Sequence, residues 1–141
     1  MLHRLKKFLP FLKSRGSGKL DHISLGKLGE DFAVQHLKEK NYGIIERNYT
    51  CRFGELDIVA RDKNVTVFAE VKSQYSYVSV KPERKIDFRK RKKLCSLARY
   101  YKKSKLNKNA SCRIDVIIVY ISRDNRVFDI KHYPNALEVR I

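Results

Sequence analysis

Acidic residues and a lysine interrupt two apolar segments between residues 54 and 72, and their types could support metal-dependent chemistry. The first segment carries Glu55 and Asp57, and the second carries Glu70 and Lys72. A charge inside a buried strand is costly unless it is paired or binds a metal. Carboxylate oxygens suit Mg²⁺, and a metal ion beside a lysine can neutralise a phosphate. These residue types are what metal-assisted phosphodiester hydrolysis requires.

The two segments are predicted to be the strands of a β-hairpin. Both are rich in β-branched residues, and a short polar stretch at residues 61–64 joins them. Side chains alternate across a strand, so Glu55 shares a face with Asp57, and Glu70 shares a face with Lys72. Pairing of the strands can therefore bring Asp57, Glu70 and Lys72 together.

The remaining pattern predicts one α/β domain in the order αβββαββ. A helix is expected from an N-cap at Ser24 to about residue 40, and a strand over 43–50 precedes the hairpin. A weakly ordered loop is expected at 73–84, followed by a helix over 86–103 and strands over 113–121 and 126–132. Residues 1–22 are predicted to be a basic extension of the domain formed by residues 23–141. We expect a mixed central sheet flanked by helices.

The net charge of +17 is concentrated in two segments of the 141-residue chain. Residues 1–20 contain six Lys or Arg and no acidic residue, whereas residues 81–108 contain thirteen against two acidic residues. Such concentration predicts a surface for a polyanion, most often nucleic acid. A merely solubilising surface is the alternative. Positive charge at the start of the second helix opposes its dipole, and an external phosphate could offset that penalty.

Cysteine usage and hydropathy favour a reduced, cytoplasmic setting. The three cysteines are scattered without a CxxC pair, and no apolar run approaches the length of a membrane span. The four histidines lack ligand spacing and are expected at surface or boundary positions. A membrane partner is not expected, although residues 1–20 could lie on a membrane surface or serve as a nucleic-acid arm.

Three segments together carry a resemblance to a known family. They are Gly26-Lys-Leu-Gly-Glu-Asp31, Asn48-Tyr-Thr-Cys-Arg-Phe-Gly-Glu-Leu-Asp-Ile-Val-Ala60 and Phe68-Ala-Glu-Val-Lys72. The chain resembles the bacterial YraN family of the PD-(D/E)XK nuclease-like superfamily, which is related to archaeal-type Holliday junction resolvases. The resemblance covers roughly residues 24–121 and implies a restriction-endonuclease-like domain.

The resemblance also implies roles for individual residues. Asp57 and Glu70 would be the metal-binding carboxylates for Mg²⁺ or Mn²⁺, Lys72 the catalytic lysine, and Glu30 an additional acidic catalytic position. The basic second helix would meet nucleic-acid phosphates through Lys85, Arg89, Lys90, Arg91, Lys92 and Lys93.

We therefore expect a nucleic-acid-binding protein that acts as a metal-dependent endonuclease on DNA phosphodiester bonds. The DNA substrate could be branched, and the sequence does not distinguish DNA from RNA. The protein could also form a homodimer. A catalytically silent binding module of the same fold is the first alternative, and a basic ribosome- or membrane-associated adaptor is the second. Asp57, Glu70 and Lys72 could instead form a buried structural network, and Glu30 could simply be solvated. Asp115 is expected to pair structurally.

Overall fold

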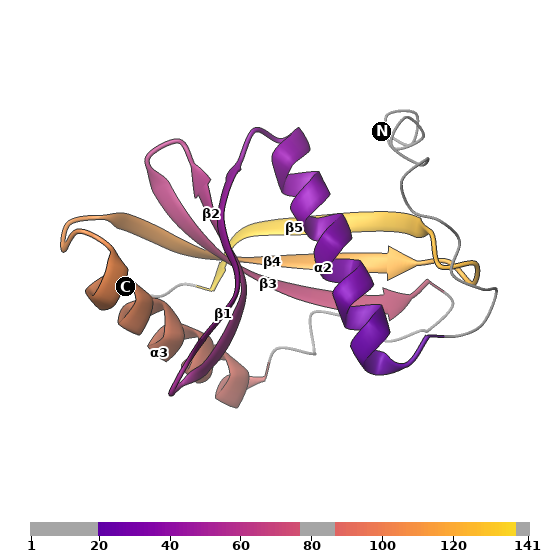
Figure 1. Ribbon diagram of the computed structural model, residues 1–141, viewed down its shortest axis with the longest axis horizontal. Coiled ribbons are helices and arrows are strands. Elements are labelled where there is room, and N and C mark those ends of the chain that lie inside the picture. Colours follow the sequence, from indigo (N-terminus) through magenta and orange to yellow (C-terminus); the bar gives the residue numbers. More distant parts are fainter. Residues whose placement is uncertain (1–19, 77–86, 138–141) are drawn as a thin grey trace.

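The computed structural model describes residues 20–76 and 87–137 and confirms the predicted order αβββαββ (Figure 1). Residues 1–19 of the expected extension, residues 77–84 of the expected loop, and Lys85 lie outside the described residues. The elements are α2 (His22–Glu39), β1 (Gly43–Cys51), β2 (Gly54–Asp62), β3 (Val65–Tyr75), α3 (Phe88–Lys105), β4 (Ser111–Ile121) and β5 (Val127–Leu137). The start of the expected loop is wrong, because β3 continues to Tyr75.

The five strands form one mixed sheet in the order β1-β2-β3-β4-β5. β3 and β4 are parallel, and the other neighbouring pairs are antiparallel. A parallel pair needs a long crossover connection, and α3 lies in the segment that joins β3 to β4. The predicted mixed sheet flanked by helices is thereby confirmed.

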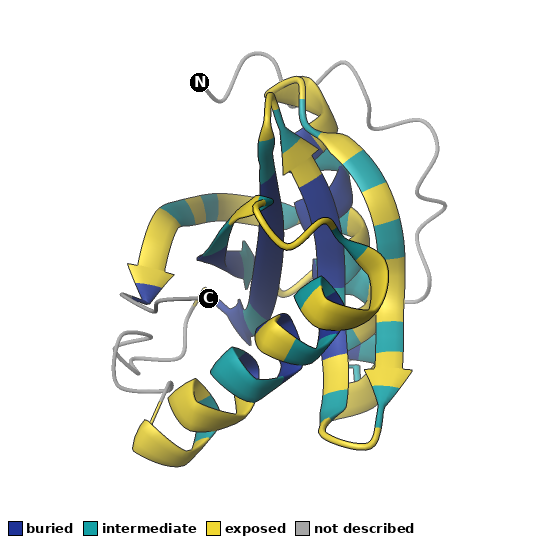
Figure 2. Ribbon diagram, turned by 90° about the vertical axis from the view of Figure 1, so that its left-hand side faces the viewer, coloured by how far each residue is buried: buried dark blue, intermediate teal, exposed yellow. Residues whose placement is uncertain are grey.

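Each helix covers its own apolar cluster on the sheet. Leu25, Ala33 and Leu37 of α2 pack on one cluster of strand residues, and Leu94 and Leu97 of α3 pack on another. β3 contributes to both clusters, because successive side chains of a strand point to opposite faces. Figure 2 shows the buried residues concentrated in the central strands. β3 is therefore the element on which groups from either side of the sheet can converge.

Both helices begin at an aspartate. The N-cap of α2 is Asp21, which accepts a hydrogen bond from Ser24 N at 2.7 Å, and the N-cap of α3 is Asp87, which accepts from Lys90 N at 2.9 Å. The expected N-cap at Ser24 is wrong, because Asp21 satisfies the amide of that serine and starts the helix three residues earlier. The predicted helix over 86–103 instead spans 88–105, and Asp87 determines its start in the same way.

Gly29 allows α2 to pack closely against β3. A Cβ atom at this position would lie 1.6 Å from Ser73 Oγ and 2.8 Å from Ser73 Cβ. Ser73 directly follows Lys72, so this close approach fixes the helix beside the part of β3 that carries Glu70 and Lys72. Glu30 follows Gly29 and is held near the same place.

Gly29→Ala should lower the free energy of unfolding by about 1–3 kcal/mol, because the added methyl group overlaps Ser73 and separates helix from strand. Gly26→Ala is the matched control in the same helix, since a Cβ there meets no atom within 4 Å. It should raise stability by up to about 1 kcal/mol through helix propensity. Urea denaturation of both variants tests this, and equal effects would contradict the packing role of Gly29.

Candidate active site

Asp57 lies where β2 and β3 separate. The ladder between these strands ends at the pair Ile58 and Ala69, one step before Asp57 would face Glu70. Instead, the Asp57 carboxylate enters the gap, and its Oδ2 atom accepts a hydrogen bond from Val71 N at 2.8 Å. A side-chain oxygen thus satisfies a backbone donor that has no ladder partner across the gap. The consequence is a carboxylate held next to β3 at a fixed position.

Glu70 is neutralised by two lysines from different elements. Its side chain is buried, with 6% exposed, and its Oε1 atom lies 3.2 Å from Lys72 Nζ. Lys90 Nζ, from the first turns of α3, makes an ion pair with the same oxygen atom. One carboxylate oxygen therefore meets two ammonium groups, one from its own strand and one from the helix that covers this face.

The electrostatics of Asp57 follow from burial beside a second carboxylate. Burial and the neighbouring charge of Glu70 raise the pKa of Asp57 to about 7, and the hydrogen bond from Val71 N only partly opposes them. The charge of Glu30 acts in the same direction on this pKa. At neutral pH the site therefore attracts a proton or another cation to Asp57.

The two lysines respond differently to the same surroundings. Burial lowers the pKa of Lys72, and the nearby ammonium group of Lys90 lowers it further. Burial also acts to lower the pKa of Lys90, but its contact with Glu70 outweighs burial and raises this pKa. Lys90 is consequently the more firmly charged partner of Glu70.

Glu30 is held beside the carboxylate pair by Asn48 of β1. Asn48 adopts a left-handed conformation, with φ of 51°, which asparagine tolerates. With its amide oriented by its hydrogen-bond partners, Asn48 donates to Glu30 Oε2 and Glu55 Oε1 at 3.1 Å each. Arg47 Nη2 lies 4.0 Å from Glu30 and 2.6 Å from Asp31. Burial raises the pKa of Glu30, although Arg47 opposes this.

The structure brings together three of the residues that the sequence singled out: Asp57, Glu70 and Lys72. Glu30 lies close enough for its charge to act on Asp57, but Asn48 links it to Glu55 and not to Asp57 or Glu70. Within residues 20–76 and 87–137, no three His, Cys, Asp or Glu side chains come close enough to hold one ion together. The metal set that these residues could provide is therefore the pair Asp57 and Glu70.

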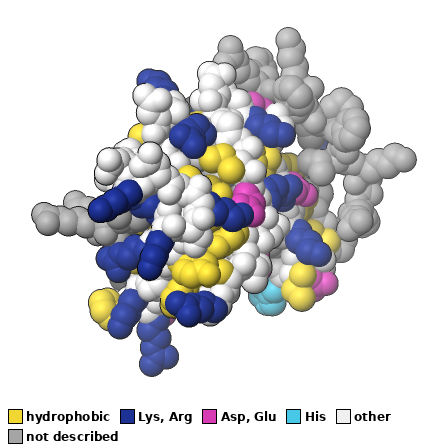
Figure 3. All heavy atoms as spheres, turned by 60° about the vertical axis from the view of Figure 1, so that its left-hand side comes forward, with side chains coloured by type: hydrophobic (Ala, Val, Ile, Leu, Met, Phe, Trp, Pro, Cys, Tyr) yellow, Lys and Arg dark blue, Asp and Glu magenta, His cyan; other side chains and the backbone are white. Residues whose placement is uncertain are grey.

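The basic residues of α3 divide into one inward and several outward side chains. Arg89, Arg91, Lys92 and Lys93 are exposed, whereas Lys90 is half-buried against Glu70. Figure 3 shows Lys and Arg side chains around a strip of hydrophobic side chains on the side of the molecule where α3 lies. The outward residues could meet phosphates without disturbing the ion pair of Lys90.

The direct contact of Lys90 with Glu70 was missed by the sequence reasoning, which assigned Lys90 to the phosphate-binding surface. The signal was present in the spacing. Lys90 precedes Leu94, Leu97 and Tyr101 by four, seven and eleven residues, which places it on the buried stripe of the helix. A lysine on the apolar face of a helix needs a buried partner, and Glu70 supplies it.

A second buried polar cluster surrounds Asp115 and has a structural role. Asp115 accepts hydrogen bonds from Arg113 Nε and Asn135 N, each at 2.9 Å, and lies 2.8 Å from His132 Nε2. Arg113 also donates to Asp62 and to the hydroxyl of Tyr42. The expected structural pairing of Asp115 is confirmed.

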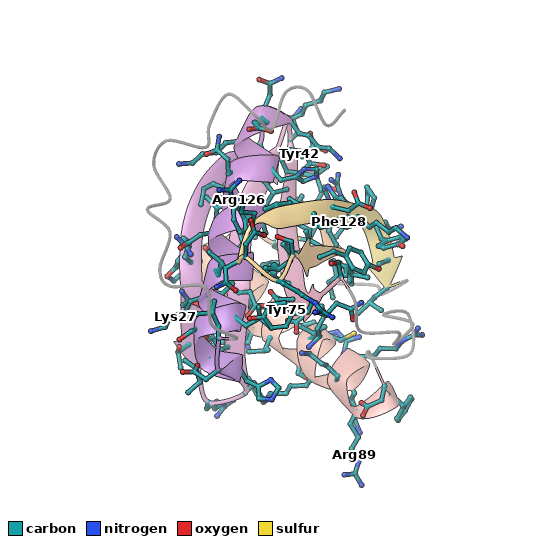
Figure 4. All side chains as sticks on the ribbon, turned by 90° about the vertical axis from the view of Figure 1, so that its right-hand side faces the viewer. Lys27, Tyr42, Tyr75, Arg89, Arg126 and Phe128 are labelled. Atoms are coloured by element: carbon teal, nitrogen blue, oxygen red, sulfur yellow. The ribbon has the colours of Figure 1, made fainter. Side chains whose placement is uncertain are left out.

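The described histidines, His22, His36 and His132, lie at surface or boundary positions as expected, but the ring of His132 is enclosed. Its side chain is 1% exposed, because it pairs with Asp115 beneath α2. The alternation of Ile130 with His132 on β5 was the available signal, since both point to the same face. In Figure 4, Tyr42 of this cluster and Arg89 of α3 lie at opposite ends of the view, so the cluster is remote from the basic surface.

Asp57 should make stability depend on pH. Its pKa is raised from 3.8 to about 7 on folding, so the folded protein binds this proton more tightly than the unfolded chain. The resulting stability is complete below pH 4 and is lost as the pH rises to about 7. Relative to Asp57→Asn, which cannot ionise, the wild-type protein should lose about 2–4 kcal/mol over this range.

Urea denaturation of the two proteins at several pH values between 4 and 8 measures this difference. Asparagine can still accept from Val71 N, so the variant keeps the backbone contact while it removes the charge. A difference in unfolding free energy that stays constant with pH would contradict the raised pKa of Asp57.

Comparisons with known proteins agree with this chain's sequence motifs. The model of "Uncharacterised protein family UPF0102" matches residues 29–119. A UPF0102 protein of Clostridium botulinum (strain Hall) is 40% identical over 116 residues, which are 82% of this chain and 94% of that protein. A UPF0102 protein of Desulforamulus reducens is 43% identical over 117 residues, which are 81% of this chain and 95% of that protein.

One solved structure is more distantly similar. It is SfsA of Pyrococcus furiosus in complex with Ca²⁺, with a TM-score of 0.36 and 18% identity, covering 78% of this chain and 64% of that chain. This similarity is too low to support an argument. The family match and the relatives suffice: the chain belongs to the uncharacterised protein family UPF0102, the YraN family that its motifs resemble.

Proposed function

We propose that this protein is a nucleic-acid-binding, metal-dependent endonuclease that hydrolyses DNA phosphodiester bonds in the cytoplasm. The observation that supports this most is the meeting of Asp57, Glu70 and Lys72 at the point where β2 and β3 separate. Two carboxylates and a lysine, with a basic helix surface beside them, combine a cation site with a phosphate site. This is the PD-(D/E)XK arrangement that the sequence motifs imply.

The residues present fit Mg²⁺ or Mn²⁺. Both ions take hard oxygen ligands, and Mg²⁺ is commonly bound by one or two carboxylates plus waters and substrate phosphates. Repulsion from Glu70 contributes to the raised pKa of Asp57, and a divalent cation between the two groups would remove that repulsion. When bound, the ion supplies charge neutralisation at the scissile phosphate and a more acidic water.

Each protein group has a role that follows from its contacts. Asp57 and Glu70 would hold the ion, and Val71 N orients Asp57 for that purpose. Lys72, 3.2 Å from Glu70, would orient water or stabilise negative charge on the phosphate. Glu30, fixed by Asn48, would add negative charge and a hydrogen-bond acceptor for water near the ion.

One observation favours the alternative of a catalytically silent binding module. Lys72 and Lys90 together already neutralise Glu70, as a structural ion-pair network would require. In that case the site would not need a metal. Metal binding and cleavage therefore discriminate between the two readings of the same geometry.

Asp57→Asn and Glu70→Gln should each reduce metal-dependent cleavage by about a hundredfold or more while leaving DNA binding largely intact. Both variants remove one carboxylate charge from the site without touching the exposed surface of α3. The measurement is cleavage of branched and linear DNA with Mg²⁺, Mn²⁺ or EDTA, together with calorimetry of Mn²⁺ binding. Asp129→Asn on the exposed part of β5 is the matched control.

Absence of metal-dependent cleavage in the wild-type protein on every DNA would refute the endonuclease assignment. Unchanged Mn²⁺ binding in the double variant would refute the assignment of Asp57 and Glu70 as ligands.

The salt dependence of DNA binding tests the outward face of α3. Arg89, Lys92 and Lys93 are exposed, so changing all three to Gln should remove up to three phosphate contacts. Each contact contributes about −0.9 to the slope of log affinity against log salt on duplex DNA, so the slope should flatten by up to about 2.7. Lys90 is left unchanged, because its ion pair belongs to the candidate active site.

Changing Lys38, Lys63 and Lys108 to Gln removes the same charge from exposed positions on other elements. A smaller change of slope is expected in this control. Equal slopes for both triple variants would mean that DNA binds without preference for α3.

A further inference from the structure

A cleft lies between the β1–β2 turn and the first half of α3, the helix that also carries Lys90. Its volume is about 260 Å³, and it is lined by Phe53, Arg89, Lys92, Lys93 and Ser96. Sites for drug-sized ligands have volumes of about 300–1,000 Å³, so this cleft suits a smaller group. Its lining combines one aromatic ring with three cationic side chains.

The aromatic wall of the cleft is held in place from two sides. The ring of Phe53 is 5.4 Å from the ring of Tyr100, and the guanidinium of Arg52 lies 4.9 Å from the centre of Phe53 and 5.6 Å from that of Tyr100. Phe53 nevertheless stays 37% exposed. A partly exposed ring fixed by such contacts is a platform for stacking, because little side-chain freedom remains to be lost.

The turn that carries Phe53 is also pressed against the helix. Gly54 has φ of 126°, and a Cβ atom there would lie 2.4 Å from Lys93 Cε and 3.8 Å from Leu97 Cδ1. A residue with a side chain would be strained at this φ, even though the flexible end of Lys93 could move aside. The turn that carries Phe53 therefore lies next to the part of α3 that carries Lys93 and Leu97.

We propose that this cleft is a subsite for one unpaired nucleotide, with its base stacked on Phe53 and its phosphate bound by Arg89, Lys92 and Lys93. An aromatic ring offers stacking to any base, and the cations complement the phosphates that flank it. Bases inside a duplex have both faces stacked already, so only a displaced or unpaired base can use the ring. This inference rests on the proposed function and deepens it, because it specifies the substrate class: nucleic acid with an unpaired nucleotide.

The geometry of α3 connects this subsite to the candidate active site. Arg89, Lys92, Lys93, Ser96 and Tyr100 follow helical spacing along one face, whereas Lys90 lies on the neighbouring face toward Glu70. A strand whose unpaired base enters the cleft would pass its next phosphates along the first turns of α3 toward Lys90. Branch points, flaps and bulges present such a strand, and a continuous duplex does not.

Binding in EDTA tests the subsite without metal or cleavage. Three labelled duplexes are compared by fluorescence anisotropy: a perfect duplex, one with a single bulged nucleotide, and one with an abasic analogue in the bulge. The abasic bulge keeps the phosphates and lacks the base. The wild-type protein should prefer the base-containing bulge over the abasic one by about tenfold, the scale of one stacked base.

Phe53→Ala should reduce this preference to near one, and Phe53→Tyr should keep it. Phe128→Ala, which removes a 60% exposed phenylalanine from β5, is the matched control and should also keep it. Figure 4 shows Phe128 well separated from Arg89. Equal wild-type affinity for both bulges, or a preference that survives Phe53→Ala, would overturn the subsite.

Failure of the subsite and failure of the endonuclease proposal give different results. If the protein prefers the base-containing bulge in EDTA but never cleaves with Mg²⁺ or Mn²⁺, the subsite proposal is supported and the endonuclease proposal is refuted. If the protein cleaves with either ion but binds both bulges equally, the endonuclease proposal is supported and the subsite proposal is refuted.

Discussion

The repulsion between two carboxylates, Asp57 and Glu70, is the constraint around which the surrounding structure is arranged. Glu70 is buried where Lys90 of α3 reaches it, and the Asp57 carboxylate lies in the gap between β2 and β3. Water screens charge poorly at such buried positions. Burial and this repulsion raise the pKa of Asp57 to about 7. Three donors offset the cost: Val71 N on Asp57, and the ammonium groups of Lys72 and Lys90 on Glu70. Removal of either lysine would leave the buried Glu70 carboxylate with a single cationic partner.

That requirement explains several features of the fold at once. The ladder between β2 and β3 must end at Ile58 and Ala69, because Val71 N is needed by Asp57 and not by a neighbouring strand. The helix α3 must begin close to the sheet, because Lys90 has to reach Glu70 from its first turns. On the other side, Gly29 lets α2 approach β3 closely enough to keep Glu30 near the same charges. The carboxylates are thus enclosed from both faces of the sheet.

The sequence predicted the parts of this arrangement that depend on local periodicity. Alternation along residues 54–72 predicted that Asp57, Glu70 and Lys72 come together, but not that β2 and β3 separate at Asp57. The 3.6-residue spacing identified the buried face of each helix. It did not predict contacts whose partners are distant along the chain. Lys90 was assigned to the surface because it lies in a run of five basic residues, 89–93. Which of these side chains is buried depends on where β3 places Glu70. The burial of His132 likewise depends on Asp115, seventeen residues away on the neighbouring strand.

The basic side chains of α3 point in two directions because of helix geometry, some toward the buried carboxylates and others toward the cleft. Successive residues turn by about 100°, so a cluster of five basic residues cannot all face one way. Lys90 lies on the same helix face as Leu94 and Leu97 and forms an ion pair with Glu70. Arg89, Lys92 and Lys93 line the cleft beside Phe53. Cationic charge that is unfavourable at a helix N-terminus is therefore used in two directions, toward buried carboxylates and toward solvent. In the proposed function, a polyanion bound by the outer group would lie along the same helix whose Lys90 contacts the buried Glu70.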